Sequence, residues 1–432
     1  MTSARTASLR QRAISTAIAL VLLMASRSAL AANRYVDNSG SPACSNSTSA
    51  GSEAQPWCTI AYGVTQIDGG DDLFVKQGTY TSSSLNILGP AGTASNPTVI
   101  RAYPGHNVTI RGGGNGGRVK IGSTSYLTFD GFIISNFNQG LFIEASSNIT
   151  VQNCTVHTVG QEAIHVRQNS SYVTIEGCEV YNTEQLGGCC NGEGIYIGTG
   201  SAGPLDNSHH ITVRDNVIHD TTDEGIELKP GTHDCIVEGN TLYNVGLTLG
   251  GNTGAIEVNQ REEGVQTWTG NPNHLVRNNL IHDSATGIRL GTGATAYNNV
   301  IYSPIAGKSG IYVNNSSGDN FPRQVYHNTI HMTSNAVVIA GGTSADVRNN
   351  IGPTTSNNLA FNAQYFVNAN ARDYRLVAGS APVDAGVNLS SVVSVDKDGN
   401  TRPVGPFPDY GAYEFGQSVA LPSAPQNLRI VP

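Results

Sequence analysis

Ionisable side chains are concentrated between Asp223 and Lys229, in the sequence Asp-Glu-Gly-Ile-Glu-Leu-Lys. The carboxylates of Asp223, Glu224 and Glu227 precede the Lys229 amine within this short stretch. Carboxylates supply the oxygen ligands that hard divalent cations prefer, and a neutral amine can accept a proton. The segment is therefore a candidate metal and catalytic site, with a plain charged strand as the simpler interpretation.

The charged segment is one unit of a sequence repeat. Each unit has a turn position that holds cysteine or asparagine, at Cys154, Cys178, Asn216, Asn240, Asn279, Asn299 and Asn328. Three residues later each unit has an aromatic residue, at His157, Tyr181, His219, Tyr243, His282, Tyr302 and His331. Short segments of alternating apolar residues between such turns are typical of parallel β-helices. We predict an all-β fold, a right-handed parallel β-helix, in which the asparagines occupy left-handed bends and hydrogen-bond along the stack, and the aromatic column stacks.

The repeat sets the predicted domain organisation. Residues 32–95 form an N-terminal cap with the first coils, and a helix from about Thr59 to Ile67 closes the end of the stack. Residues 96–360 form the β-helix, residues 361–415 a C-terminal cap, and residues 416–432 a linker-like tail. Asp384, Asp398 and Asp409 are expected to be turn and cap residues of the C-terminal segment.

The first 31 residues have the pattern of a secretion signal. Basic residues are followed by an apolar run and then by Ala29-Leu30-Ala31, a small-residue cleavage site. The apolar run is too short to span a bilayer, so we expect a secreted protein without a membrane span.

The chain is acidic, with 24 basic and 32 acidic residues and a formal charge of −8. Removing residues 1–31 takes away four arginines and no acids, which changes the charge to −12. An acidic protein binds nucleic acid and anionic lipid poorly, and a polyanionic substrate needs a local group of cations. We expect a monomer without nucleic-acid partners.

Seven cysteines in a secreted chain predict disulfides. Cys44 and Cys58 are expected to close an N-terminal loop. Cys154 and Cys178 occupy one column on adjacent units, which permits a disulfide. Cys235 is expected to be a buried free thiol, and Cys189-Cys190 either form a vicinal bridge or pair elsewhere.

Alignment of the units places the charged residues in three columns. The column two residues before the aligned apolar residue holds Glu162, Glu193 and Glu224. The column one residue after it holds His165, Tyr196, Glu227, Glu257 and Arg289. The column three residues after it holds Arg167, Gly198, Lys229 and Asn259. Apolar residues take the alternate positions, so these side chains are predicted to point outward.

The glutamate column is a candidate metal site. Glu162, Glu193 and Glu224 would lie about one strand spacing, ~4.8 Å, apart, with Asp223 adjacent. Like charges that face each other across strands are unfavourable, so the carboxyls either have raised pKa values or bind a cation. Oxygen ligands in an extracellular protein favour Ca²⁺. The alternative is a solvated acidic face.

Lys229 lies on the same outward face and has two interpretations. It is either a base beside a metal or an ion-pair partner of Glu227 or Glu257. Arg167 lies two units away in its column, and Arg261 follows Asn259.

The chain resembles the secreted β-helix polysaccharide lyases of families nine and six. The segments RYVDNSG, PWCTIAYGVTQIDGGDDLFVKQGTY and NPTVIRAYPGHNVTIRG resemble the N-terminal part of the family-nine type. The segment EGIELK resembles the family-six segment in which a calcium-binding glutamate precedes the catalytic lysine by five residues, as Glu224 precedes Lys229. Asn259 stands where family six has a catalytic arginine, and Arg261 is the nearby substitute.

The resemblance implies calcium-assisted β-elimination on an acidic, uronate-containing polysaccharide. Lys229, Arg261 and Glu227 are then the catalytic candidates. The metal candidates are Glu162, Glu193, Asp223 and Glu224, and the substrate-binding candidates are Arg167, His165, Tyr196, Glu257, Asn259 and Arg289. A retaining glycoside hydrolase using Glu227 and Glu257, a uronate epimerase, and a non-catalytic glycan-binding protein remain alternatives.

Overall fold

The computed structural model describes residues 31–416 except 115, 188–191, 201–204, 247–252, 260–269, 303, 304, 306, 315–320 and 333–334. The chain divides into two units, Met1–Ala32 and Asn33–Pro432, and nearly all of the first lies outside the described residues. The predicted secretion signal and Cys189-Cys190 are therefore not described. The helical part of the described chain is too short to cross a membrane.

Residues Asn33–Ala360 wind through three parallel sheets, which we call sheets A, B and C. Sheet A consists of β1 Asn33–Val36, β2 Asp72–Val75, β5 Thr98–Ala102, β8 Ser125–Asp130, β11 Ser147–Gln152, β14 Ser171–Glu176, β17 Thr212–Arg214, β20 Ile236–Glu238, β23 His274–Arg277, β26 Ala294–Tyr297, β29 Gln324–Tyr326 and β32 Asp346–Arg348. Sheet B consists of β3 Gly78–Thr81, β6 Val108–Arg111, β9 Phe132–Ser135, β12 Thr155–His157, β15 Glu179–Tyr181, β18 Val217–Thr221, β21 Thr241–Val245, β24 Leu280–His282, β27 Val300–Tyr302, β30 Thr329–His331, β33 Ile351–Gly352 and β34 Leu359–Ala360. Sheet C consists of β4 Leu85–Leu88, β7 Val119–Gly122, β10 Leu141–Glu144, β13 Ile164–Arg167, β16 Ile195–Ile197, β19 Ile226–Leu228, β22 Gly254–Val258, β25 Thr286–Leu290, β28 Ile311–Val313 and β31 Val337–Ile339.

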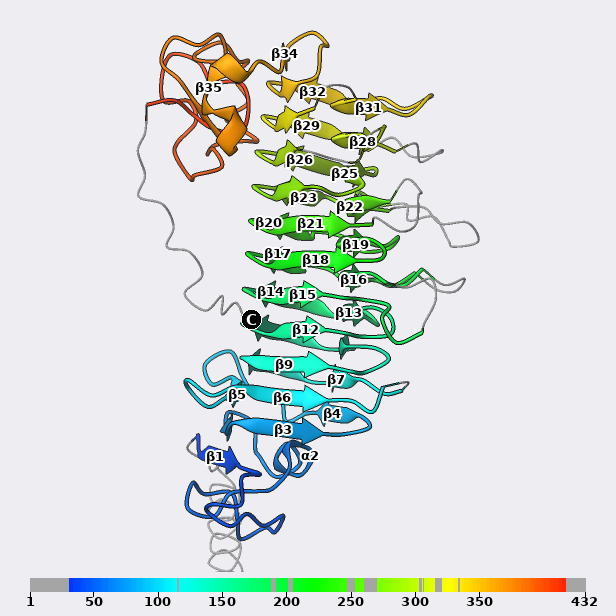
Figure 1. Cartoon of the computed structure of the whole chain (residues 1–432), viewed down its shortest axis with the longest axis vertical. Helices are drawn as coiled ribbons and strands as arrows, with labels where there is room; N and C mark the ends of the chain where they lie inside the picture. The colour runs from blue at the N-terminus through cyan, green and yellow to red at the C-terminus, as the bar shows by residue number, and fades with distance from the viewer. Residues whose placement is uncertain are drawn as a thin grey trace, which may run out of the picture. The chain divides into compact units, whose positions relative to one another are not determined.

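Successive coils stack in register (Figure 1). The chain passes from sheet A to sheet B to sheet C in each coil, so every sheet pairs a strand with the equivalent strand of the next coil. The apolar residue of alternate strand positions points into the lumen, as Ile195, Ile226 and Ile256 do on adjacent strands of sheet C. The predicted parallel β-helix is confirmed, and the opposite side chains of each strand are left for the outer face.

A column of asparagines fixes the turn between sheets A and B. The Asn240 Nδ2 donates to Asn279 Oδ1 (3.1 Å) and to the Val213 carbonyl (2.9 Å). The backbone N–H of Asn240 donates to the same Asn279 Oδ1 (3.0 Å). Equivalent bonds join Asn216, Asn240, Asn279, Asn299, Asn328, Asn350 and Asn358. The predicted hydrogen-bonded column is confirmed.

The left-handed bend lies one residue before this column and not on it. Positive φ angles occur at Asp215, Asn278 and Asn298, each directly before a column asparagine. The column residues themselves keep ordinary backbone angles, because their side chains turn inward to reach the next coil. The aromatic column does stack as predicted, from His157 to Tyr302, with ring centroids 4.7–5.3 Å apart.

The cysteines only partly follow the prediction. Cys44 and Cys58 form the expected disulfide, and Cys235 is a buried free thiol. Cys154 and Cys178 are also free thiols and do not form the permitted disulfide. Each Sγ instead lies 3.3–3.4 Å from the carbonyl two residues earlier in its own coil and 3.9 Å from a carbonyl of the preceding coil. The Nδ2 of Asn328 contacts the same two kinds of carbonyl.

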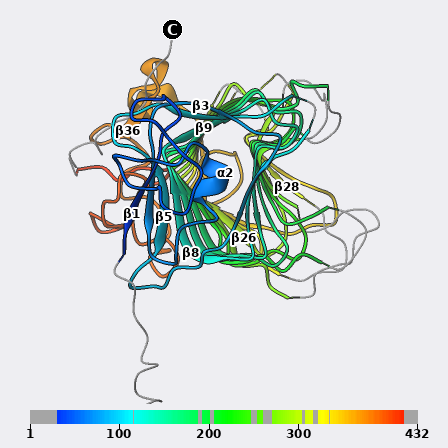
Figure 2. The same cartoon turned by 90° about the horizontal axis from the view of Figure 1, so that it is seen from below.

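The N-terminal end contains much less helix than predicted. The described residues hold a single short α-helix, α2 Ile60–Gly63, which begins after the N-cap Thr59 and gives way to turns. The two-turn helical cap expected over Thr59–Ile67 is therefore wrong. Ile60, Val64 and Ile67 still pack onto the lumen core, and α2 lies across the coils when they are viewed along the stack (Figure 2). Burial of this apolar face, and not helix length, covers the core.

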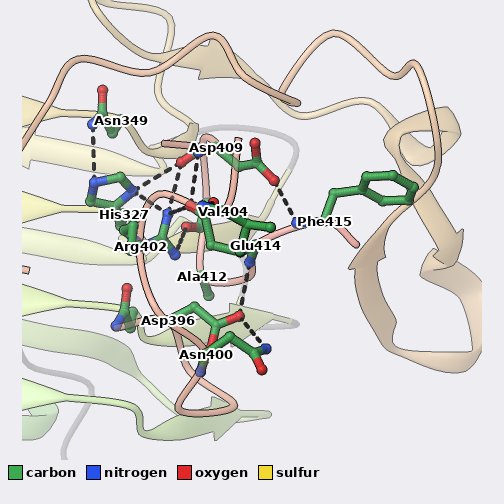
Figure 3. Close-up of polar contacts among 12 residues, drawn as sticks. His327, Asn349, Asp396, Asn400, Arg402, Val404, Asp409, Ala412, Glu414 and Phe415 are labelled. Carbon is green, nitrogen blue, oxygen red and sulfur yellow. Dashed lines mark hydrogen bonds and ion pairs between the residues drawn. The ribbon is translucent and has the colours of Figure 1, made fainter. Parts of the chain in front are cut away.

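The C-terminal segment folds back onto the last coils through buried polar contacts (Figure 3). Short 3-10 turns η1 Ala363–Tyr365 and η2 Ala369–Ala371 accompany the antiparallel pair β35 Phe366–Asn368 and β36 Asp373–Leu376. Arg402, 2% exposed, contacts Glu414 (2.8 Å) and donates to the Asp409 carbonyl (2.9 Å).

The C-terminal aspartates serve the turns of this segment. The Asp409 carboxylate accepts bonds from the N–H groups of Asp384 and Phe415, each at 2.6 Å. Asp396, which is fully buried, accepts from the N–H groups of Asp398 and Asn400. Of the three predicted aspartates, Asp409 has this turn role, whereas the carboxylate of Asp398 contacts Arg375 (3.1 Å).

Candidate active site

Sheet C positions the predicted site. Tyr196 pairs with Glu227, and Glu227 with Glu257, across β16, β19 and β22 (Figure 1). Lys229 and Asn259 directly follow β19 and β22, and their N–H groups bond to the preceding strand at Ile197 and Leu228. The three strands 195–197, 226–228 and 256–258 therefore stack in the predicted register, which brings the columns together on one outer face.

A pocket of about 610 Å³ opens on this face. It is lined by Glu162, His165, Arg167, Glu193, Tyr196, Thr199, Gly200, Asp223, Glu224, Glu227, Lys229, Glu257, Asn259 and Arg289. These include every candidate residue from the sequence except Arg261, which falls in 260–269, outside the described residues. Thr199 and Gly200 are additional lining residues that the columns did not indicate.

Carboxylates gather at the centre of the pocket. One oxygen from each of Glu193, Asp223 and Glu224 lies within 4.8 Å of the others, and the same holds for Glu224, Glu227 and Glu257. Burial and the Glu227 charge raise the pKa of both Glu193 and Glu224. Glu193 is 4% exposed, and its Oε2 has no hydrogen-bond partner among the described residues. A cation would relieve this buried like-charge cluster and satisfy that oxygen.

Glu162 lines the pocket but is outside both three-carboxylate groups found among the described residues. Its Oε1 lies 3.7 Å from the His165 Nδ1, and burial raises the pKa of its carboxyl. Burial also lowers the pKa of His165 to about 3, so this ring is neutral. Its Nε2 contacts the Gly198 carbonyl at 2.7 Å, which requires that this nitrogen carries the proton.

Lys229 faces the acidic centre. Its Nζ lies 2.7 Å from Glu227 Oε1 and 5.1 Å from the centre of the Tyr196 ring. Asn259 Nδ2 approaches the same Glu227 oxygen at 3.5 Å. The ion pair with Glu227, one of the two sequence interpretations, is therefore present in this arrangement.

Arginines stand on both sides of the acidic centre. Arg289 pairs with Glu257 (2.5 Å), while Arg167 donates to Glu144 Oε1 from Nε (2.9 Å) and Nη2 (2.6 Å). The columns read from the sequence did not include Glu144. Leu141 pairs directly with Ile164, so Glu144 stands in the Arg167 column. Residues 141–144 read Leu-Phe-Ile-Glu, which does not alternate between apolar and polar residues, so the period of two gave no signal for Glu144.

The chain matches the model of a known protein family. Residues 40–259, just over half of the chain, match the family model described as the Pel9A-like, right-handed β-helix region. The chain belongs to the Pel9A-like β-helix family. Residues 189–365 also match the model of the periplasmic copper-binding protein NosD. Of the two lyase families that the sequence resembles, the family-nine type is thus the one matched.

One curated relative is pectate lyase PEL9 of Emericella nidulans, 39% identical over 83 residues. The match covers 19% of this chain and 19% of that relative, so the chain spans about a fifth of the relative's length. Among solved structures, pectate lyase Pel9A has a TM-score of 0.63 at 18% identity, covering 89% of this chain and 96% of that one. A rhamnogalacturonan lyase has a TM-score of 0.59 at 16% identity, covering 77% and 90%.

The alginate lyase from Paenibacillus sp. str. FPU-7 has a TM-score of 0.52 at 20% identity, covering 70% of this chain and 98% of that one. At these identities the solved structures establish the shared fold alone.

Proposed function

We propose that this protein is a polysaccharide lyase that cleaves a uronate-containing polysaccharide by calcium-assisted β-elimination. The observation that supports the proposal most directly is Lys229, which points into a pocket whose centre is a cluster of buried carboxylates. Membership of the Pel9A-like family and the lyase names of the relatives agree with it. The Cys44–Cys58 disulfide and the match to a periplasmic family agree with an extracytoplasmic location, and the N-terminal pattern with secretion.

The donor set suits calcium. Glu193, Asp223 and Glu224 offer oxygen ligands close together, and the buried Glu193 Oε2 lacks a hydrogen-bond partner among the described residues. These three residues would hold the ion. Bound there, Ca²⁺ would neutralise a uronate carboxylate and so acidify the proton on the adjacent carbon.

Lys229 would take that proton. In the elimination, the C5–H electrons form a carbon–carbon double bond to C4, the C4–O bond breaks, and the departing sugar oxygen acquires a proton. Lys229 must be neutral to accept a proton, whereas its contact with Glu227 at 2.7 Å favours the ammonium form. The rate should therefore rise as the pH increases toward the value at which the Lys229 amine loses its proton.

The close approach of Glu227 and Glu257 favours glycoside hydrolysis as a second candidate. Their oxygens lie within 4.8 Å, similar to the separation in retaining enzymes. Each carboxylate, however, contacts a cation, Lys229 or Arg289, whereas one member of a retaining pair must carry a proton to protonate the leaving group. The geometry therefore supports the lyase better.

The two reactions yield different products. Polygalacturonate, alginate, glucuronan and rhamnogalacturonan would be incubated with the protein, with calcium and with a calcium chelator. We expect new ultraviolet absorbance from an unsaturated product on one of these polymers, lost on chelation. New reducing ends without that absorbance would instead establish the hydrolase.

Lys229→Arg distinguishes a base from a substrate anchor, because guanidinium keeps both charge and proton. We expect it to be nearly as inactive as Lys229→Ala. Substantial activity in the Arg variant would exclude Lys229 as the base and direct attention to Glu227 and Glu257.

A further inference from the structure

Three cations gather on sheet C beside the pocket, on the side nearer the N-terminus. Lys120 belongs to β7, Arg118 directly precedes β7, and Arg167 ends β13. Between β7 and β13 lies β10, which contributes Phe142 and Glu144. We call Arg118, Lys120 and Arg167 the basic cluster.

Glu144 joins the basic cluster into one unit. The Arg118 Nη1 lies 3.7 Å from Glu144 Oε1, and the Lys120 Nζ lies 3.3 Å from Oε2. Arg167 donates twice to Oε1. Burial alone would raise the pKa of Glu144, but hydrogen bonds and charge from Arg167, with the other two cations, lower it. Glu144 therefore remains ionised between three cations. The charges of Arg167 and Arg118 also act on Glu162, whose pKa burial raises.

The cations are held in place but remain accessible. The guanidinium carbons of Arg118 and Arg167 lie 4.6 and 5.1 Å from the centre of the buried Phe142 ring. Glu144 is only 6% exposed at its side chain, whereas Arg118, Lys120 and Arg167 are 30%, 26% and 25% exposed. Stacking on Phe142 reduces the conformational freedom that the arginines would lose on binding an anion. The excess charge thus faces solvent on a fixed platform.

On the other flank of the pocket, the described cation is Arg289, which pairs with Glu257. Along sheet C the order β7, β10, β13, β16, β19 places Lys120 four strands from Lys229, about 19 Å along the stack. Arg167 is two strands from Lys229, about 10 Å away. A carboxylate bound by the basic cluster would therefore belong to a different sugar from the one at Lys229.

We propose that Arg118, Lys120 and Arg167 form a subsite that binds a second uronate carboxylate, so that the polysaccharide runs along sheet C across several coils. The inference rests on the proposed function for the substrate class, but it concerns binding and not the chemical step. It also identifies the local cations that an acidic protein of formal charge −8 needs in order to hold a polyanion.

The test measures binding without turnover. Two proteins would be compared in the presence of calcium: Lys229→Ala, and Lys229→Ala carrying Arg118→Gln and Lys120→Gln. Each would be titrated with polygalacturonate, alginate and glucuronan, and with methyl-esterified polygalacturonate as an uncharged probe. We expect the two substitutions to weaken binding of the best polyuronate about tenfold, because two charge-assisted contacts are lost. Binding of the methyl ester should be weak and unchanged. Added salt should weaken binding more in the parent than in the substituted protein.

Arg214→Gln is the matched control, since Arg214 is a partly exposed cation paired with Glu176 on sheet A, away from the pocket. It should leave the affinity unchanged. Arg118→Lys with Lys120→Arg keeps both charges and should retain most of the affinity, which separates loss of charge from misfolding. Equal affinity in the Gln variant and its parent, or no binding of any polyuronate by the parent, would overturn the subsite.

The outcomes also distinguish the subsite from the proposed function. Charge-dependent polyuronate binding without unsaturated products would remove the lyase and keep the subsite. Unsaturated products from the wild-type protein, with unchanged affinity in the Gln variant, would support the lyase and exclude the subsite.

Discussion

Substitutions at Lys229 and Glu227 can distinguish a catalytic role of Lys229 from a role in stability, because the two side chains are in contact. Glu227 is 2% exposed and its Oε1 lies 2.7 Å from Lys229 Nζ. Lys229→Met removes this cation from a buried carboxylate, and losing one partner of a buried pair costs about 3 kcal/mol of unfolding free energy. If Lys229 is the base, the same substitution should also reduce kcat by about 10²–10⁴-fold.

Adding Glu227→Gln to Lys229→Met replaces the pair by neutral side chains of similar volume. We expect most of the lost stability to return, because the Glu227 charge that lost its partner is removed, while activity stays absent. Unfolding would be followed by urea titration, and turnover by the ultraviolet absorbance of the unsaturated product. Recovery of turnover together with stability would show that Lys229 only supports the fold, which would refute its role as the base.

Three further expectations follow from other parts of the structure. Glu224→Gln should weaken calcium binding about tenfold by removing a ligand charge, measured by calorimetry, and should raise the melting temperature of the metal-free protein because Glu224 lies in a buried like-charge cluster. Asn279→Ala removes the acceptor for both the N–H and the Nδ2 of Asn240, and two orphaned buried donors cost about 4 kcal/mol in a urea titration. Burial and the neighbouring Arg402 lower the pKa of His327 in the folded protein. Its contribution to stability is therefore complete above the unfolded pKa of about 6.5 and is lost by about 1.4 kcal/mol per pH unit below that value. His327→Gln should remove this part of the pH dependence of thermal unfolding.

The fold was predictable because its main determinant is local in sequence and repeats. An asparagine at one turn position, with an aromatic residue three positions later, fixes the phase of every coil, and both columns are present. Once the phase is known, the outward residues of sheet C follow from the period of two. That is why nearly all of the candidate residues line one pocket, although they come from several coils.

The errors concern features that the period does not determine. The apolar segment 59–67 was predicted to be a helix, but only Ile60–Gly63 is helical. A few buried side chains of this segment cover the lumen core without a longer helix. Strand spacing permits a bond between Cys154 and Cys178, but it cannot show that each thiol points at a backbone carbonyl. Glu144 was absent from the predicted columns because Leu-Phe-Ile-Glu does not alternate, although Glu144 pairs directly with Arg167 in the structure.

The acidic centre works against the fold. The asparagine column places neutral, hydrogen-bonded side chains on adjacent coils, and sheet A places opposite charges there, as in the pair Glu238 and Arg277. Just before β16 and β19, and on β22, the coils bring Glu193, Glu224 and Glu257 into a buried region. Among the described residues, Glu193 and Glu257 each keep an oxygen without a hydrogen-bond partner there. Glutamine would fill these positions at lower electrostatic cost. A rigid stack on both sides can hold such a cluster in place, and a cation together with an anionic substrate would balance its charge.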